Sequence, residues 1–420
     1  MWLGWGGGSI QSGDVLGATL EGSPLDATVF GVLIAAGIIV LIRRKRTGVM
    51  LMTCAPVAIY YIYCLLSAMW SPFPETSLKR WIKCVGDLVM VLVILTDAQP
   101  TSALRRLYSR IGFVMFPLSV LLIKFTNLGV SYDELGPHYT GVTTNKNGFG
   151  MMLYVLSIGA VWNFRALLLG TRASNRGRRL AAHATLLVFG IVLLRVAHSA
   201  TSIFCFILGS GLILATGLPI IKKRPRMLHV VCLGILICGA GSVLLGGTGV
   251  FTSAMGRTSD LSGRTAIWAA SISSADNPLI GTGFESFWNK NNPKVVDILL
   301  MHGYGDISNL NSAHNGYIQI YLDLGLLGVC LLSFILISGY LRAVKAFRID
   351  RELGSLFLAY VITCAFYSIT EAGFRIMTFS WIFLLLAVVG ATGVITSMAK
   401  LKRLESRASR SLATFENTPV

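Results

Sequence analysis

The stretch SAHNGYIQIYLDLGLLGVCLLSFILISGY, residues 312–340, joins two segments of opposite character. A short polar segment containing His314 is followed, from Gly316, by an almost uninterrupted apolar run. At about 1.5 Å per residue this run is long enough to cross a bilayer as a helix. The stretch therefore predicts a transmembrane helix whose first turn lies at the membrane border, with His314 just outside it.

Similar runs recur along the chain. Of its 420 residues 54% are hydrophobic and 13% are charged, and the mean hydropathy is +0.68, which excludes a soluble globular domain. We predict an all-α integral membrane protein with about eleven transmembrane helices, ten or twelve being the alternatives. The predicted spans are 27–42, 48–70, 81–97, 111–128, 148–170, 185–198, 202–220, 229–247, 316–340, 355–370 and 376–398.

The basic residues fall unequally on the predicted connections. The net charge is +17, and 24 of the 36 Lys and Arg residues lie in 43–46, 98–110, 171–184, 221–228, 341–354 and the tail from Lys400. The alternate connections 71–80, 124–147, 248–315 and 371–375 hold only 9. This asymmetry predicts cytoplasmic basic clusters and an extracytoplasmic 248–315 loop, rather than a nucleic-acid partner.

The same reading divides the chain into five parts. Residues 1–26 form an extracytoplasmic lead, 27–247 an N-terminal transmembrane bundle and 248–315 an extracytoplasmic catalytic loop. Residues 316–398 form the C-terminal transmembrane helices. Residues 399–420 form a basic cytoplasmic tail near anionic membrane lipid.

Arg264 is the first candidate for anion binding. Ser262 can cap a helix over about 264–275, which places Arg264 in the first turn, where a cation opposes the helix dipole. A bound anion such as phosphate would offset the repulsion between the Arg264 cation and the helix dipole, because it accepts from both the guanidinium and the free backbone N–H groups. The alternative is an arginine that reaches water or Asp260.

His314 is the candidate general base. Its place before the 316–340 helix keeps the imidazole neutral and able to accept a proton. An interfacial residue that only caps or hydrogen-bonds is the alternative.

Three further cations belong to the same predicted side. Lys146 begins a span, Lys124 lies deeper in one, and Arg195 lies at the outer end of another. Together with Arg264 they suit a diphosphate. Snorkelling of Lys124 and contact of all four with ordinary lipid phosphates are the alternatives.

Three carboxylates are weaker candidates. Glu285 is an additional candidate base, although a solvated loop carboxylate is the simpler reading. Asp323 is expected to pair with a neighbouring span, and Glu371 is expected to form a local pair with Arg375, four residues later. No nucleotide-binding or metal-binding motif occurs, so we predict no cofactor and no metal site, and the eight cysteines are expected to pack as small apolar residues.

Six short motifs occur in a fixed order between the predicted spans. They are Trp70-Ser71-Pro72, Asn145-Lys146-Asn147-Gly148, Ser262-Gly263-Arg264-Thr265-Ala266-Ile267-Trp268, Asn277-Pro278-Leu279-Ile280-Gly281-Thr282-Gly283, Ala313-His314-Asn315-Gly316-Tyr317 and Leu324-Gly325-Leu326-Leu327-Gly328. The set resembles the O-antigen ligase and polymerase superfamily, and most of all its exopolysaccharide polymerase branch.

The resemblance implies a metal-independent glycosyltransferase of the bacterial inner membrane. Its donor would be a polyprenyl-diphosphate-linked glycan and its acceptor another glycan or a lipid A core, with a flippase and a chain-length regulator as further partners. Arg264 would contact the donor diphosphate, with Lys146, Asn147, Lys124 and Arg195 as candidate helpers, and His314 would activate the acceptor. A Ser-Arg or Ser-Lys pair of the superfamily is absent from Ser199-Ala200-Thr201-Ser202, for which Arg195 is a candidate replacement.

Polymerisation is favoured on the resemblance alone. An O-antigen ligase is the first alternative, and a polysaccharide or lipid transporter is the second.

Overall fold

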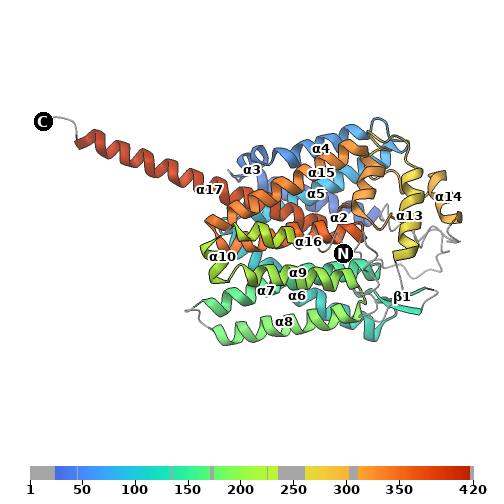
Figure 1. Ribbon diagram of the computed structural model, residues 1–420, viewed down its shortest axis with the longest axis horizontal. Coiled ribbons are helices and arrows are strands. Elements are labelled where there is room, and N and C mark those ends of the chain that lie inside the picture. The colour runs from blue at the N-terminus through green and yellow to red at the C-terminus, as the bar shows by residue number, and fades with distance from the viewer. Residues whose placement is uncertain are drawn as a thin grey trace.

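The structure is a computed structural model that describes residues 24–416, apart from residues 45, 134–135, 171–174, 225, 235–260 and 302–310. It is a helical bundle with one two-stranded hairpin (Figure 1). The helices of the first half are α2 (Pro24–Ile42), α3 (Thr47–Thr53), α4 (Ala55–Ser67), α5 (Pro74–Leu95), α6 (Pro100–Phe125), α7 (Lys146–Leu169), α8 (Arg176–Val196), α9 (Ala200–Ala215) and α10 (Pro219–Lys223). Those of the second half are α13 (Leu261–Ser273), α14 (Pro293–Met301), α15 (Gly316–Ile349), α16 (Arg351–Thr370) and α17 (Phe379–Glu416).

Within the described residues, seven helices are long and apolar enough to cross a membrane. They are α2, α6, α7, α8, α15, α16 and the part of α17 up to Ser406. The bent pair of α3 and α4, broken by 81°, makes up to eight, and α9 is a shorter apolar helix. A multi-span helical membrane protein is confirmed. Eleven spans stay a prediction, because most of the expected 229–247 span lies outside the described residues.

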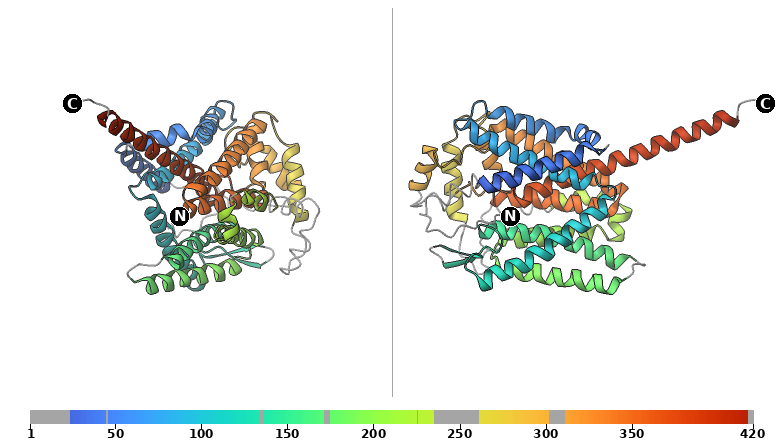
Figure 2. Two further views of the ribbon diagram at one scale, coloured as in Figure 1. Left: turned by 60° about the vertical axis from the view of Figure 1, so that its left-hand side comes forward. Right: turned by 180° about the vertical axis from the view of Figure 1, so that it is seen from behind.

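The connections alternate between the two ends of the bundle. The predicted basic connections, at the starts of α3, α6, α8 and α16, gather at one end (Figures 1 and 2). The opposite end carries the β-hairpin, α13 and the starts of α7, α15 and α17. We call these the basic end and the loop end. The tail from Lys400 continues α17 as one helix that projects from the basic end.

Helix α16 lies at the centre of the bundle. Its sequence is apolar on all sides, as expected of a helix surrounded by others, and it packs against α15, α17, α9 and α7. Peripheral α2, by contrast, buries only Gly37 and Leu41. The last residue of α16, Thr370, is therefore presented in the middle of the loop end, and Glu371 follows it directly.

A break in α15 holds the loop against the bundle. Gly325 has φ +65°, outside the helical range, and the backbone N–H groups of Leu326 and Leu327 turn to donate to the carbonyls of Pro278 and Leu279 at 2.8 and 3.1 Å. In return, Gly283 N–H donates to the Asp323 carbonyl at 2.7 Å. Two of the motifs noted in the sequence thus bind each other through their backbones.

The side chain of Asp323 supports the same joint. Its carboxylate accepts from the backbone N–H of Phe287 at 3.0 Å and from the side-chain amide Nε2 of Gln319 at 2.9 Å. The expected pairing with a neighbouring span is wrong, because the carboxylate is bonded to the loop backbone at Phe287 and to Gln319 of its own helix. Asp323 is a structural anchor for the loop.

Hydroxyl groups join the loop to the turn between α4 and α5. Ser286 Oγ lies 2.5 Å from Ser71 Oγ and 2.7 Å from Ser77 Oγ, and all three are buried. Phe284 N–H donates to Ser67 Oγ at 2.9 Å. The motif Trp70-Ser71-Pro72 therefore acts as a docking site for the loop.

The hairpin fixes the start of α7. Strands β1 (Val130–Asp133) and β2 (Gly136–Tyr139) pair antiparallel, with Val130 opposite Tyr139. Asn145 then caps α7 by accepting from Gly148 N–H at 2.7 Å. Lys146 and Asn147 consequently occupy the first turn of a well-defined helix.

Replacement of Gly325 tests the joint between loop and bundle. A Cβ atom there would lie 2.2 Å from the Leu279 carbonyl carbon, at a φ that L-residues adopt only with strain. We expect Gly325→Ala to lower the free energy of unfolding by about 2 kcal/mol or more, measured by thermal unfolding in detergent. Gly211→Ala is the control, because no atom lies within 4 Å of its Cβ position. Equal stability of the two variants would contradict this account.

Candidate active site

Three side chains from distant parts of the chain converge on the carboxylate of Glu371. Arg264 Nη2 donates to Oε1 at 2.9 Å, and Asn147 Nδ2 donates to Oε2 at 2.9 Å. His314 Nδ1 lies 3.3 Å from Oε2. Glu371 is buried, whereas the side chains of Arg264 and His314 stay 20% and 28% exposed. The carboxylate is thus an internal anchor for two groups that reach the surface.

Arg264 is brought to Glu371 by α13. Its Nη1 donates to the Thr370 carbonyl at 2.5 Å, so the guanidinium also satisfies the C-terminal end of α16, where a cation is favourable. Because α13 already includes Leu261, Ser262 lies inside the helix and the expected N-cap at Ser262 is wrong. Among the described residues, two of the five N–H donors of Arg264 have an acceptor, and the other three are open to a further ligand.

His314 is held by its backbone as much as by its ring. It has φ +48°, rare for a side-chain-bearing residue, and the next residue, Asn315, caps α15 by accepting from Tyr317 and Ile318 N–H at 2.9 and 3.1 Å. The carboxylate assigns the proton to Nδ1, which leaves the lone pair of Nε2 free. This is the tautomer that a general base requires.

Asn147 and Lys146 come from the start of α7. The position of Asn147 is fixed twice, because Tyr367 Oη donates to its carbonyl at 2.9 Å while its amide holds Glu371. Lys146 is half-buried, and no acidic group of the described chain pairs with it. Lys146 therefore adds positive charge next to the cluster without a compensating carboxylate.

The charge state of Glu371 follows from its neighbours. Burial raises the pKa of the carboxyl group, but the charge of Arg264 and the hydrogen bond from His314 outweigh burial and hold the pKa below its ordinary value of 4.5. Glu371 is consequently ionised at neutral pH.

A second buried carboxylate, Glu285, lies in a different environment. Arg375 Nε donates to Oε2 at 3.1 Å and Ile376 N–H to Oε1 at 3.3 Å, while Arg80 donates to the Glu285 carbonyl. Two expectations are therefore wrong: Glu285 is not solvated, and Arg375 does not pair with Glu371. The turn after α16 aims Glu371 and Arg375 at different parts of the loop.

Lys124 and Arg195 lie in the last turns of α6 and α8, and both are exposed. The expected end-of-span position of Arg195 is confirmed. Lys124 is less deep than expected, because α6 ends at Phe125. Neither cation joins the cluster at Glu371.

Sequence reasoning assigned no functional role to Glu371. The signal that could have found it is its place directly after the apolar run 355–370, since a carboxylate at the end of a buried span needs a partner. Within the described residues, no group of three or more His, Cys, Asp or Glu side chains could hold a metal ion.

Comparison with known proteins agrees with the motifs. Residues 185–333, which include Arg264 and His314, match the family model described as O-antigen ligase. The exopolysaccharide production protein ExoQ of Rhizobium meliloti (strain 1021) is 24% identical over 292 residues. Over these two regions the chain is similar to the O-antigen ligase family and to an exopolysaccharide production protein. The alignment with ExoQ covers 68% of this chain and 64% of ExoQ, so the chain spans less than two thirds of that protein's length.

The region that matches the family model begins after α7 and ends before α16. Glu371 and Asn147 thus lie outside this region. Glu371 nevertheless contacts Arg264 and His314, and Asn147 contacts Glu371. The geometry adds these two side chains to the pair that the motifs indicated.

Replacement of Glu371 tests the anchor. We expect Glu371→Gln to lower the free energy of unfolding by about 2 kcal/mol at pH 7, because hydrogen bonds to a charged group are lost. A depressed folded-state pKa contributes stability above the unfolded pKa and loses it as the pH falls through the folded value. The difference between wild type and variant should therefore persist at neutral pH and close below about pH 4.5.

Thermal unfolding in detergent, measured at pH values from about 3.5 to about 8 so that the series includes the ordinary carboxyl pKa, gives this difference. The control is Glu75→Gln, which removes an exposed carboxylate paired only with Lys79. No measurable change is expected there. A Glu371→Gln variant as stable as Glu75→Gln at pH 7 would refute the anchor.

Proposed function

We propose that the cluster of Arg264, His314, Asn147 and Glu371 is the active site of a membrane glycosyltransferase that polymerises polyprenyl-diphosphate-linked oligosaccharide repeat units. The observation that carries the proposal is the shared carboxylate, which holds a proton acceptor and an anion-binding cation side by side at the loop end of the bundle. A glycosyl transfer from a lipid diphosphate needs both groups.

His314 activates the acceptor. Its Nε2 takes the proton from a sugar hydroxyl as the hydroxyl oxygen forms a bond to the anomeric carbon of the donor. The bond between that carbon and the diphosphate oxygen breaks, and the lipid diphosphate leaves with the electron pair. Glu371 stabilises the imidazolium that forms, in the manner of a carboxylate behind a catalytic histidine.

Arg264 and Lys146 stabilise the departing diphosphate. The Arg264 side chain is only 20% exposed, so its interaction with a bound anion would be stronger than in bulk water. Lys146 contributes the uncompensated charge, because the charge of Arg264 is partly balanced by Glu371. Lys124 and Arg195, exposed at the same end, would attract the donor at longer range.

The orientation proposed from the basic clusters is consistent with this chemistry. The loop end would face the periplasm of a bacterial inner membrane and the basic end the cytoplasm. Residues 248–315 would then be the catalytic loop between the 27–247 bundle and the 316–398 helices, with residues 399–420 as a cytoplasmic tail. Glu285 would serve as a structural residue rather than a base, since both of its oxygens are occupied.

Similarity to an exopolysaccharide production protein supports polymerisation over ligation. The two reactions differ in the acceptor, which is another lipid-linked repeat in the first and a lipid A core in the second. A transporter would move the lipid-linked glycan with its glycosidic bonds intact. Purified protein in liposomes, supplied with a synthetic lipid-diphosphate repeat and no nucleotide, separates the three by the product formed.

The roles of His314 and Arg264 give a quantitative expectation in that assay. His314→Gln cannot accept the proton and should lower kcat by about 10²- to 10⁴-fold. Arg264→Gln should lower it by about 10²- to 10³-fold through lost charge stabilisation. His198→Gln, an exposed histidine at the same end of the bundle, should retain wild-type activity. Full chain extension by His314→Gln would contradict the proposal.

The three lysine and arginine residues proposed to assist Arg264 should rank by their environment. Lys146→Gln should raise KM for the donor by about ten-fold, because a half-buried charge is poorly screened. Arg195→Gln and Lys124→Gln remove exposed charges and should change KM by about two- to three-fold. Measurement of KM at low and high salt tests this order. A larger effect at Arg195 or Lys124 than at Lys146 would place the diphosphate elsewhere.

A further inference from the structure

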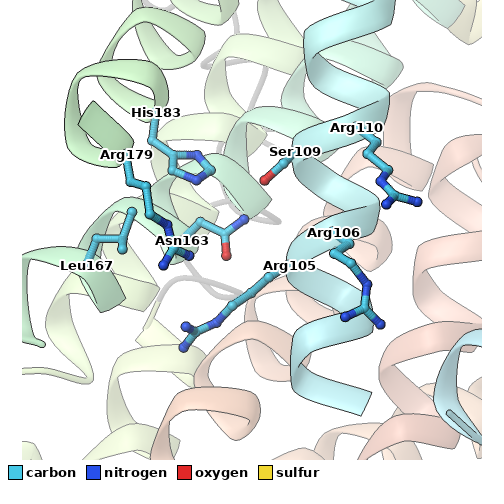
Figure 3. Close-up of a pocket in the computed structure, with 8 residues that line it drawn as sticks. All are labelled: Arg105, Arg106, Ser109, Arg110, Asn163, Leu167, Arg179 and His183. Atoms are coloured by element: carbon cyan, nitrogen blue, oxygen red, sulfur yellow. The ribbon is translucent and has the colours of Figure 1, made fainter. Parts of the chain in front are cut away.

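A cavity lies at the basic end of the bundle, opposite the candidate active site. Its volume is about 210 Å³, and helices α6, α7 and α8 enclose it (Figure 3). Its polar lining includes Arg105, Arg106, Arg110, Arg179, Asn163 and His183. Nothing in the proposed transfer reaction uses these residues.

The lining carries uncompensated positive charge. Arg105 pairs with Glu352, and Arg106 lies 3.8 Å from Asp97. Arg110 and Arg179 are exposed and have no acidic partner in the described part of the chain. Figure 3 shows Arg179 next to Asn163, whereas Arg110 points to the other side of α6. An arginine beside a cavity without a carboxylate partner, as Arg179 is, indicates a site for an anion.

Asn163 provides a second, independent observation. Its side chain is buried, with a relative exposure of 3%, yet neither Nδ2 nor Oδ1 has a hydrogen-bond partner among the described residues. Nδ1 of the buried His183 is also without a partner there. Figure 3 shows Asn163 and His183 from α7 and α8 facing Arg105 and Ser109 of α6. Buried polar groups without hydrogen-bond partners are rare. Asn163 and His183 line a cavity with room for a ligand that could bond to them.

The unpaired groups specify the chemistry of the ligand. The arginines and Asn163 Nδ2 require acceptor oxygens, which a phosphate supplies, and Asn163 Oδ1 requires a donor such as a hydroxyl group. Exposed apolar side chains lie farther along the same helices, including Phe113 of α6 and Val188 of α8, 41% and 59% exposed. The Phe113 ring also packs 6.4 Å from the His183 ring. A phosphate with a hydroxylated substituent and acyl chains fits this arrangement.

We propose that the cavity between α6, α7 and α8 binds the polyol-phosphate head group of an anionic lipid, with Asn163 reading the head group and Arg179 binding its phosphate. The acyl chains would lie along the exposed apolar faces of α6 and α8. The site is separate from the transfer reaction and does not depend on it. Basic pockets between transmembrane helices are a common solution for such lipids.

Lipid-dependent thermal stability tests the proposal. The full-length protein is delipidated in neutral detergent, and its melting temperature is measured with added phosphatidylglycerol, phosphatidylcholine or inorganic phosphate. We expect phosphatidylglycerol to raise the melting temperature in a saturable manner and phosphatidylcholine to have at least ten-fold lower apparent affinity. Saturable stabilisation by inorganic phosphate alone would identify a free anion rather than a lipid as the ligand and would overturn the lipid assignment.

Two variants separate the site from general surface charge. Asn163→Leu is nearly isosteric, and because it removes an unpaired buried amide it should be at least as stable as wild type without lipid, but its apparent affinity for phosphatidylglycerol should fall about ten-fold. Arg179→Gln should also weaken binding several-fold. Arg178→Gln, its exposed neighbour outside the cavity lining, is the charge-matched control and should bind as wild type.

Three further results would overturn the proposal. One is equal stabilisation by phosphatidylglycerol and phosphatidylcholine. Another is wild-type lipid affinity in both Asn163→Leu and Arg179→Gln. The third is an equal loss of affinity in Arg178→Gln and Arg179→Gln, which would show attraction to the whole basic end rather than binding in the cavity.

Discussion

The carboxylate of Glu371 is the interaction on which the loop end depends. A buried ionised carboxylate is costly unless its oxygens are hydrogen-bonded and its charge is balanced, and here Arg264, His314 and Asn147 meet that requirement. The three partners come from α13, the start of α15 and the start of α7, which are far apart in the sequence. One charge at the end of the most central helix therefore fixes the relative positions of all three.

Arg264 shows how the same contact serves structure and chemistry. Its bonds to Glu371 and to the Thr370 carbonyl set the direction of the guanidinium, and its remaining N–H groups have no acceptor in the part of the chain that the structure describes. A free arginine on a loop would lose conformational entropy when a ligand binds, whereas a guanidinium already held in place loses little. The pairing with Glu371 that partly neutralises Arg264 therefore also fixes the geometry in which Arg264 can bind an anion.

The loop needs support that is independent of this cluster. The reciprocal backbone bonds around Gly325, the serine hydroxyls at Ser71, Ser77 and Ser286, and the pair of Glu285 with Arg375 join it to α4, α5, α15 and the turn before α17. These contacts hold the loop in place without using Arg264, His314, Asn147 or Glu371. The candidate site is thus built on a rigid base, which is what placement within hydrogen-bond distance of a substrate requires.

The sequence predicted a multi-span helical membrane protein, because apolar length is a local property, and the predicted basic connections described by the structure gather at one end of the bundle (Figure 1). Arg264 and His314 were selected from their places next to predicted helix starts, and the structure brings them to one carboxylate. Long-range partners could not be obtained in this way. Spacing paired Glu371 with Arg375, yet the turn between α16 and α17 is not helical and directs the two side chains apart.

Glu285 illustrates the same limit. A glutamate in a polar loop reads as solvated, and only the folding of that loop onto α5 and the turn after α16 buries it. Asn163 and the arginines around the basic-end cavity escaped attention for a related reason, since the three helices that carry them are adjacent only in the folded bundle.

A double-mutant cycle between Glu371 and His314, read as the rate of transfer from a lipid-diphosphate donor, tests the central claim most directly. If Glu371 acts through the imidazole, the cost of Glu371→Gln should largely disappear in a His314→Gln background, so that the double variant is nearly as active as His314→Gln alone. Independent, multiplicative losses from the two substitutions would contradict the account, because Glu371 would then not act through His314.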